Sequence, residues 1–142
     1  MSADRLEDVA RLAAAASRQL TAGGEVPDAV AALHHARSFV ELADEDGLVD
    51  SVESLAEQED GDAAVADVVD AFRALGLGAA ADQLSAAYNW SEDGYPVDAD
   101  AGIKATDVRA ALDTRFEETV DAERLEELLA ERLDEDPEAY GL

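Results

Sequence analysis

The chain has 142 residues, of which 35 are acidic and 10 basic, so its formal net charge is −25. This length suits one hydrophobic core, and we expect a single helical domain over residues 1–142. Because 48% of the residues are apolar, the charge does not imply disorder, and the lack of cysteine excludes disulfides, thiolate metal sites and cysteine nucleophiles.

Apolar residues at helical spacing predict three helices in the first part of the chain. The first covers residues 6–20 and ends before Gly23. Pro27 suits the opening turn of the second helix, and Gly47 precedes the third. Gly61 interrupts the apolar pattern, so we expect the third helix to end before it.

The middle of the chain predicts two more helices and a loop. Residues 65–75 form the clearest amphipathic pattern, which Gly76 ends, and residues 77–88 continue as a second helix. Residues 89–105 hold turn-forming residues with little periodicity, and we expect one long surface loop there, with Trp90 and Tyr95 packed back on the domain.

Two helices are predicted after this loop. Thr106 is a candidate N-cap for the first, which carries Phe116, and Asp121 is a candidate N-cap for the second, which Pro137 ends. No segment shows sustained strand alternation. The sequence therefore predicts an all-α fold of about seven short helices with one long surface loop.

The chain has features of a cytoplasmic protein adapted to salt. No apolar run approaches the roughly 18 residues of a membrane span, and the start MSADRLEDVA lacks the features of a signal peptide, so we expect a cytoplasmic location and no membrane partner. Lys104 is the only lysine and Ile103 the only isoleucine, a usage similar to that of salt-accumulating halophiles. At molar salt the Debye length falls to about 3 Å, which screens most of the repulsion.

Two loop patterns resemble ligand-binding motifs, and each has a plainer interpretation. Gly76, Gly78 and Ala81 spell G-x-G-x-x-A, but no strand precedes them, so helix ends explain the glycines better. Residues 89–100 place oxygen-bearing side chains at several positions of an EF-hand frame, although Asp100 stands where a bidentate Glu is usual. Calcium binding stays open, with a solvated turn as the expected alternative.

Histidine chemistry is not expected. His34 and His35 are adjacent, so on a helix they point about 100° apart and cannot form an i, i+4 metal pair. We expect one to pack and the other to be solvated. We therefore assign no catalytic, metal-binding or cofactor-binding residue, and calcium at residues 89–100 stays the one open alternative.

The strongest local feature is an acidic stretch. Between Arg37 and Arg73 there are twelve acids and no basic residue. We expect the partner contacts to come from Glu41, Asp44, Glu45, Asp46, Asp50, Glu53 and Glu57. Four of these, at positions 46, 50, 53 and 57, have the spacing of one helical column about 16 Å long, with a charge about every 5 Å against about 3.4 Å per phosphate along one DNA strand. The alternative is a solvated helix face.

A family resemblance rests on two stretches, AAVADVVDAFRALGLGAAADQLSAAY at residues 63–88 and DTRFEETVDAERLEELLAERLDEDPEAYG at residues 113–141. They resemble the DNA-mimic protein family, a small all-helical acidic domain otherwise of unknown function, and the resemblance covers about residues 27–141. The family's glycine-rich element after the second helix is represented here by Gly47 within EDGLVDSVESL. The resemblance implies an acidic decoy that occupies the DNA-binding surface of a basic protein and does not itself bind nucleic acid.

Two function classes remain open. In the first, the chain is an acidic interaction domain that mimics DNA. In the second, it is a halophile-adapted helical binding or scaffold domain whose acids serve only solubility in high salt. The second class predicts acids spread over every exposed helix face and a fold that loosens below roughly molar salt. A metal-dependent enzyme that uses the 89–100 loop is the least favoured class.

Overall fold

The structure, a computed structural model, describes residues 3–142, with side chains from residue 5 onward. Most of the described residues are helical and none lies in a strand, which confirms the all-α prediction. The helices are α1 (Ala3–Thr21), α2 (Asp28–Asp46), α3 (Leu48–Ala56), α4 (Gly61–Ala74), α5 (Gly78–Glu92), η1 (Ala99–Ala101), α6 (Ala105–Thr119), α7 (Ala122–Glu135) and η2 (Pro137–Tyr140).

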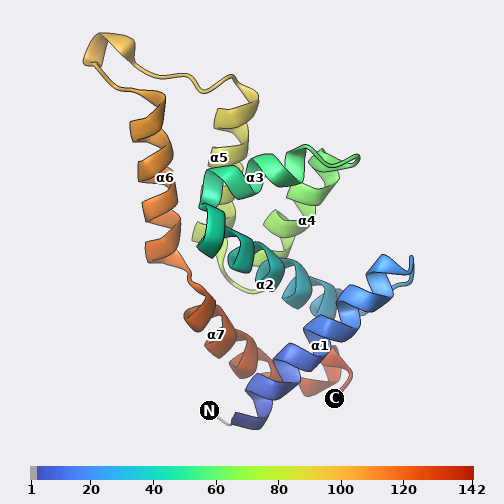
Figure 1. Cartoon of the computed structure of the whole chain (residues 1–142). Coiled ribbons are helices and arrows are strands. Elements are labelled where there is room, and N and C mark those ends of the chain that lie inside the picture. Colours follow the sequence, from blue (N-terminus) through green and yellow to red (C-terminus); the bar gives the residue numbers. More distant parts are fainter. Residues whose placement is uncertain (1–2) are drawn as a thin grey trace.

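The α2 helix lies at the centre of the molecule (Figure 1) and contacts α1, α3, α4 and α7. The α5 and α6 helices run side by side as a long hairpin, which packs against α3. The α1 and α7 helices lie against each other near the two chain ends. In the part of the chain that the structure describes, no helix has the length and apolar character needed to cross a membrane.

The three phenylalanines of the chain join three helices in one core. Phe39 of α2, Phe72 of α4 and Phe116 of α6 are each at most 2% exposed. Their ring centroids lie 5.8–6.2 Å apart in edge-to-face arrangements. Such aromatic pairs contribute about 0.5–1.5 kcal/mol each beyond their buried area, so this cluster fixes how the α5–α6 hairpin meets α2 and α4.

Gly47 separates α2 from α3 and turns the chain between them. Its backbone has φ 87° and ψ 163°, a region that is open almost only to glycine. A Cβ atom at this position would lie 2.7 Å from a carboxylate oxygen of Asp113 on α6. The break between the two helices therefore depends on glycine for both conformation and space.

Several predicted boundaries are confirmed and others are wrong. Asp121 caps α7, as predicted, by accepting a hydrogen bond of 2.9 Å from the backbone N–H of Arg124. The N-cap of α6 is Lys104 rather than Thr106. The α3 helix ends at Ala56, before Gly61, as predicted. Gly61 itself is the first, buried residue of α4, where a side chain would collide with the carbonyl oxygen of Ala56.

The predicted loop over 89–105 is also too long. The α5 helix continues to Glu92, and η1 interrupts the connection before α6 begins at Ala105. The sequence did not predict the last turn of α5, because that turn projects from the core and its residues are mostly polar, so apolar periodicity is weak there. Trp90 packs on the core as predicted, and Tyr95 packs on Trp90 with ring centroids 5.0 Å apart.

Candidate partner-binding surface

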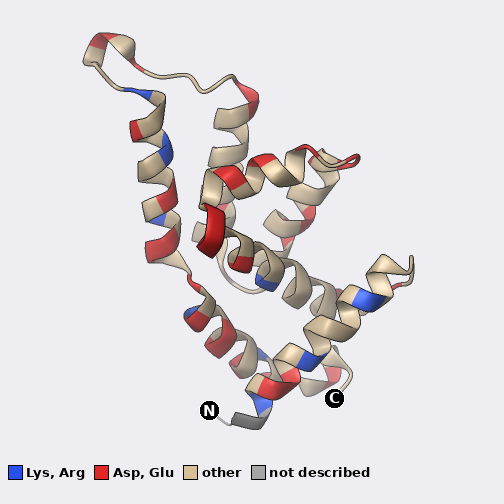
Figure 2. Cartoon of the chain, viewed as in Figure 1, with Lys and Arg blue, Asp and Glu red and all other residues tan. Residues whose placement is uncertain are grey.

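Acidic residues lie on every α-helix of the described chain (Figure 2). Most arginines are already held in ion pairs within the chain. These pairs are Arg5 with Asp8 and Asp134, Arg11 with Asp8, Arg37 with Glu41 and Glu126, Arg73 with Asp82, Arg109 with Asp50 and Glu53, Arg124 with Asp121, and Arg132 with Glu135. The surface that remains for partners is therefore strongly negative.

The predicted acidic column does not form along one helix. Gly47 ends α2 directly after Asp46, so Asp46 lies on α2, whereas Asp50 and Glu53 lie on α3 and Glu57 is the C-cap of α3. The predicted column required one continuous helix over positions 46–57, but the chain turns at Gly47 and the helix axis changes direction there. The prediction of one continuous column was therefore wrong.

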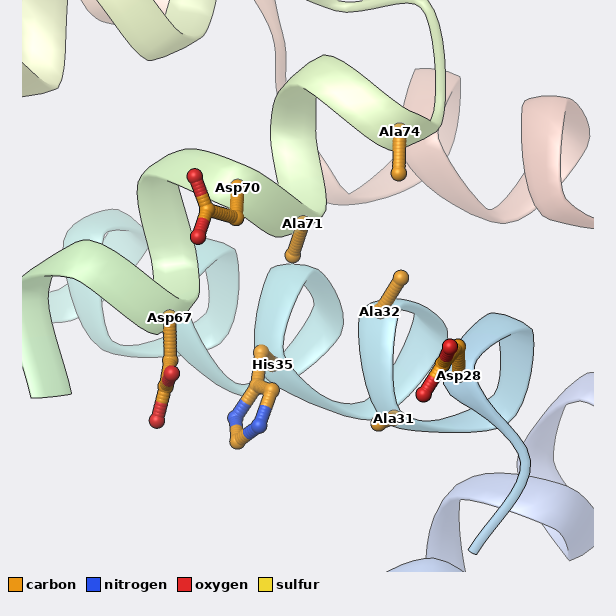
Figure 3. Close-up of a pocket in the computed structure, with 8 residues that line it drawn as sticks. All are labelled: Asp28, Ala31, Ala32, His35, Asp67, Asp70, Ala71 and Ala74. Atoms are coloured by element: carbon orange, nitrogen blue, oxygen red, sulfur yellow. The ribbon is translucent and has the colours of Figure 1, made fainter. Parts of the chain in front are cut away.

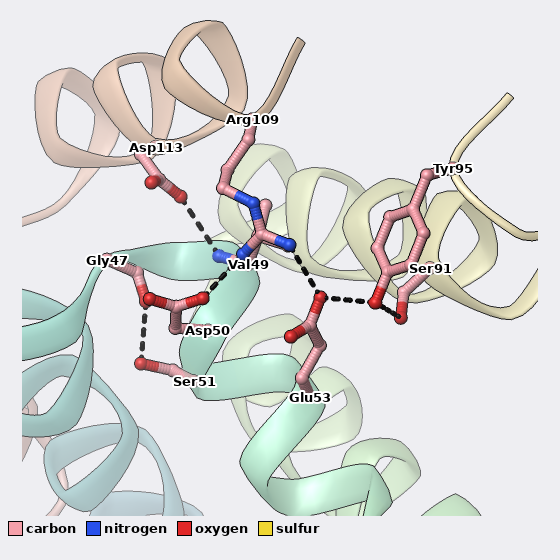
Figure 4. A network of polar contacts seen from close by, with 9 residues as sticks. All are labelled: Gly47, Val49, Asp50, Ser51, Glu53, Ser91, Tyr95, Arg109 and Asp113. Carbon is pink, nitrogen blue, oxygen red and sulfur yellow. Dashed lines mark hydrogen bonds and ion pairs between the residues drawn. The ribbon is translucent and has the colours of Figure 1, made fainter. Parts of the chain in front are cut away.

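The two middle members of the predicted column, Asp50 and Glu53, form ion pairs with Arg109 of the same chain (Figure 4). Arg109 of α6 donates to Asp50 Oδ1 at 2.5 Å and to Glu53 Oε1 at 2.9 Å. The Tyr95 hydroxyl donates to the same Glu53 oxygen at 2.7 Å, and the Arg109 guanidinium lies 5.8 Å from the centre of the Tyr95 ring. We call these four residues, Asp50, Glu53, Tyr95 and Arg109, the Arg109 clasp.

The Arg109 clasp holds the α5–α6 connection against α3. Tyr95 has φ 60°, a left-handed conformation that costs an L-residue roughly 1–2 kcal/mol, and its contacts with Glu53, Trp90 and Arg109 offset that cost. Partial burial alone would lower the pKa of Arg109, but the hydrogen bond and charge of Glu53 and the charge of Asp50 outweigh it and raise that pKa. Arg109 therefore keeps its charge, and Asp50 and Glu53 serve the fold.

A second polar contact fixes the start of α3. The backbone N–H of Val49 donates to Asp113 Oδ1 at 2.9 Å, which gives one of the free N–H groups of the first turn a partner. The Ser51 hydroxyl, although buried, donates to the carbonyl oxygen of Gly47 at 2.7 Å. Together with the clasp, the bond between Val49 and Asp113 attaches α3 to α6, whereas the Ser51 bond stabilises the first turn of α3 (Figure 4).

The other predicted contact residues are exposed. Asp44, Glu45 and Asp46 form the last turn of α2, which has no basic residue, and Glu41 lies one turn earlier. Among the described residues, the one ion pair that this set makes is between Glu41 and Arg37, at 3.7 Å. Glu57 is exposed at the far end of α3. We call Glu41, Asp44, Glu45 and Asp46 the α2 acidic end.

Placing acids at this end of a helix opposes its stability. The C-terminal end of a helix carries a partial negative charge, so each carboxylate there costs about 0.3–1 kcal/mol at low ionic strength. Acids that serve only hydration could occupy any exposed position without this cost. The α2 acidic end is therefore the part of the predicted surface that most resembles a functional feature.

A groove between α2 and α4 was not predicted. One cavity of about 390 Å³ is lined by His35 with Asp28, Asp67 and Asp70 (Figure 3). A neighbouring cavity of about 370 Å³ shares His35 and Asp67 and adds His34. Its remaining lining includes Phe39, Leu42, Leu55 and Val68. We call the two cavities together the α2–α4 groove.

Both histidines line the α2–α4 groove, which corrects the prediction that one packs and one is solvated. Both are partly buried, and their ring centroids lie 5.4 Å apart. Burial, followed by the charge of the neighbouring His35, lowers the pKa of His34. The adjacent pair could have indicated the groove only if the position of α4 had been known.

The described residues contain no group of three or more acidic or histidine side chains placed to hold a metal ion. The EF-hand frame at 89–100 is not a loop at its start, because Asn89 and Ser91 lie within the helical turns of α5. Gly76 and Gly78 lie at the end of α4 and the start of α5, as helix punctuation predicted.

Comparisons with protein-family models, with curated proteins and with solved structures find no match to this chain. The resemblance to the DNA-mimic family therefore stays a prediction.

Proposed function

We propose that the chain is an acidic helical interaction domain that binds a basic protein, and that it occupies that protein's DNA-binding surface as a DNA mimic. The α2 acidic end supplies the main contacts, with Glu57 at the other end of α3. Asp50 and Glu53 act indirectly, because the Arg109 clasp uses them to hold α3 in place. The proposal assigns the chain no catalytic role and a cytoplasmic location.

The observation that carries the proposal is the unfavourable concentration of charge at the α2 acidic end. Three acids in the last helical turn have no basic residue beside them, although arginines elsewhere pair with nearby acids. A basic partner would relieve both their mutual repulsion and their conflict with the helix dipole. The free energy recovered in this way would add to the affinity of the complex.

Salt imposes a strong condition on this proposal. A contact that replaces four phosphates loses roughly a hundredfold in affinity when salt rises from about 50 to about 200 mM, as DNA itself does. A partner in a salt-rich cytoplasm would therefore need apolar contacts as well, because burial of apolar surface is not screened.

The proposal is tested by capture of partners on the immobilised chain from its own cell extract at native salt, followed by addition of excess duplex DNA. We expect a basic DNA-binding protein that the DNA displaces. Capture should fail when the α2 acidic end is neutralised by Glu41→Gln, Asp44→Asn, Glu45→Gln and Asp46→Asn. A partner that is indifferent to both DNA and these substitutions would contradict the proposal.

The second candidate function is a halophile-adapted binding or scaffold domain whose acids only maintain hydration in high salt. The observation that favours it is the presence of acids on every α-helix. Thermal unfolding at increasing salt tests this candidate. It requires a fold that loosens below roughly molar salt, and full stability in dilute buffer would count against it.

A further inference from the structure

The α2–α4 groove has two chemically different halves that meet at His35 and Asp67. The first half is floored by small side chains, among them Ala32 and Ala71, and carries carboxylates on both walls (Figure 3). The surface that lines the second half is mainly apolar, and Leu42 and Leu55 contribute to it. Each half is near the lower end of the roughly 300–1,000 Å³ range of ligand pockets.

The carboxylates of the first half have no countercharge. Among the described residues, the side chains of Asp28, Asp67 and Asp70 make no ion pair or hydrogen bond. Asp67 and Asp70 lie on α4, and Asp28 lies across the groove on α2. A cleft lined by charge of one sign concentrates counter-ions, so this half of the groove attracts cationic groups.

We propose that the α2–α4 groove binds a basic polypeptide segment of the partner. An apolar side chain of that segment enters the half lined by His34, Leu42 and Leu55, and its Arg or Lys side chains pair with Asp67, Asp70 and Asp28. The inference rests on the proposed function in that the partner is a basic protein.

Charge selects this occupant over the others. A second copy of the chain carries the same net charge of −25, and nucleic acids and anionic membranes are also negative, so each would be repelled by the carboxylate half. A short apolar segment alone would fill one half and leave the carboxylates without a countercharge. A basic segment with one apolar anchor satisfies both halves.

The groove also supplies the contact that salt does not weaken. Its apolar half is lined in part by Leu42 and Leu55. Leu42 directly follows Glu41 in the sequence and Leu55 comes just before Glu57, so the apolar half adjoins these predicted contact residues. Ionic contacts at the carboxylates weaken with salt, whereas burial of the anchor persists. The complex should therefore keep part of its affinity in molar salt.

The experiment uses a short synthetic peptide of arginine and alanine with one central leucine, and a control peptide with serine in place of the leucine. His34 and His35 are the only histidines of the chain, so their imidazole NMR signals report on the groove alone. We expect the leucine peptide to shift these signals and to bind about tenfold or more tightly than the serine peptide.

Charge variants locate the cationic contacts. We expect the double variant Asp67→Asn with Asp70→Asn to weaken peptide binding about threefold to tenfold at low salt. The matched control, Asp93→Asn with Asp100→Asn, removes the same charge from the α5–α6 connection and should change the affinity less than about twofold. Circular dichroism checks that both variants remain folded.

Three results would overturn the groove proposal: no binding of the leucine peptide, binding that leaves both histidine signals unmoved, or equal weakening by the two double variants. If the groove fails in this way while a DNA-displaceable partner is still captured, the proposed function stands. If the peptide occupies the groove but no such partner exists, the proposed function fails and the groove remains a binding site for basic segments.

Discussion

Removing Arg109 should weaken the fold and loosen the α5–α6 connection. In Arg109→Gln, Asp50 and Glu53 lose their ion pairs and Tyr95 loses its cation. The Arg109 and Glu53 side chains are 31% and 25% exposed and that of Asp50 is 58% exposed, so each pair contributes about 0.5 kcal/mol, near the middle of the range for surface pairs. The Tyr95 contact adds about 0.5–1 kcal/mol.

The total of about 1.5–2 kcal/mol corresponds to a fall in Tm of about 3–8 °C at low salt for a chain of this length. Thermal unfolding by circular dichroism measures the fall. The emission of Trp90, whose ring lies 5.0 Å from that of Tyr95, reports the local change and should shift to the red.

Arg73→Gln is the matched control for this prediction. Arg73 pairs with Asp82 across more exposed positions, with side chains 51% and 71% exposed, so its removal should lower Tm by about 1 °C or less. If Arg109→Gln leaves Tm and Trp90 emission at the wild-type values, or if both variants lose the same stability, the clasp is not what holds the connection.

Three further predictions concern the helix break, the groove and the net charge. Gly47→Ala should lower the free energy of unfolding, measured with denaturant, by about 2 kcal/mol or more, because the added methyl group clashes with Asp113 and alanine disfavours a φ of 87°. The control Gly23→Ala, with φ 82° but no neighbour within 4 Å, should lower it by about 1 kcal/mol, and equal losses would contradict the role of Asp113. The pKa of His34, measured by NMR in molar salt, should lie below its ordinary value of 6.5. The unfolded chain therefore binds more protons than the folded chain, so the stability linked to neutral His34 should be present above about pH 6.5 and lost as the pH falls through the lowered pKa. A His34→Gln variant that keeps the wild-type pH dependence of stability between about pH 5 and 7 would refute this. Tm should rise with added NaCl, because the net charge of −25 repels itself in dilute buffer, and a Tm independent of salt would contradict strong self-repulsion.

The sequence was informative where local chemistry decides the structure. Apolar spacing and Gly76 correctly predicted the end of α4. Asp121 was correctly predicted as the N-cap of α7, where it accepts a hydrogen bond from Arg124, three positions later. These features depend on residues within one helical turn of each other. Any helix of the same pattern would show them, whatever it packs against.

The candidate site could be predicted only in part, because its contacts join distant segments. Arg109 is 59 positions from Asp50, and no local pattern indicates that the two residues meet. The column over positions 46–57 failed because one residue, Gly47, changed the helix axis. The α2–α4 groove exists only once α4 lies against α2, so neither helix alone contains its signal.

The central claim is that the α2 acidic end binds a basic, DNA-binding partner. The most direct measurement is the affinity of the captured partner as a function of salt, for the wild type, for the variant neutralised at the α2 acidic end, and for a matched variant. The matched variant removes four exposed acids on other elements: Glu7, Glu25, Asp100 and Glu138.

We expect neutralisation of the α2 acidic end to weaken binding and to flatten the slope of log affinity against log salt by about 3–4, since each replaced phosphate contributes about 0.9. The matched variant should keep the wild-type slope. Equal slopes for all three proteins, or a partner that duplex DNA does not displace, would contradict the claim and leave the acids as an adaptation to salt.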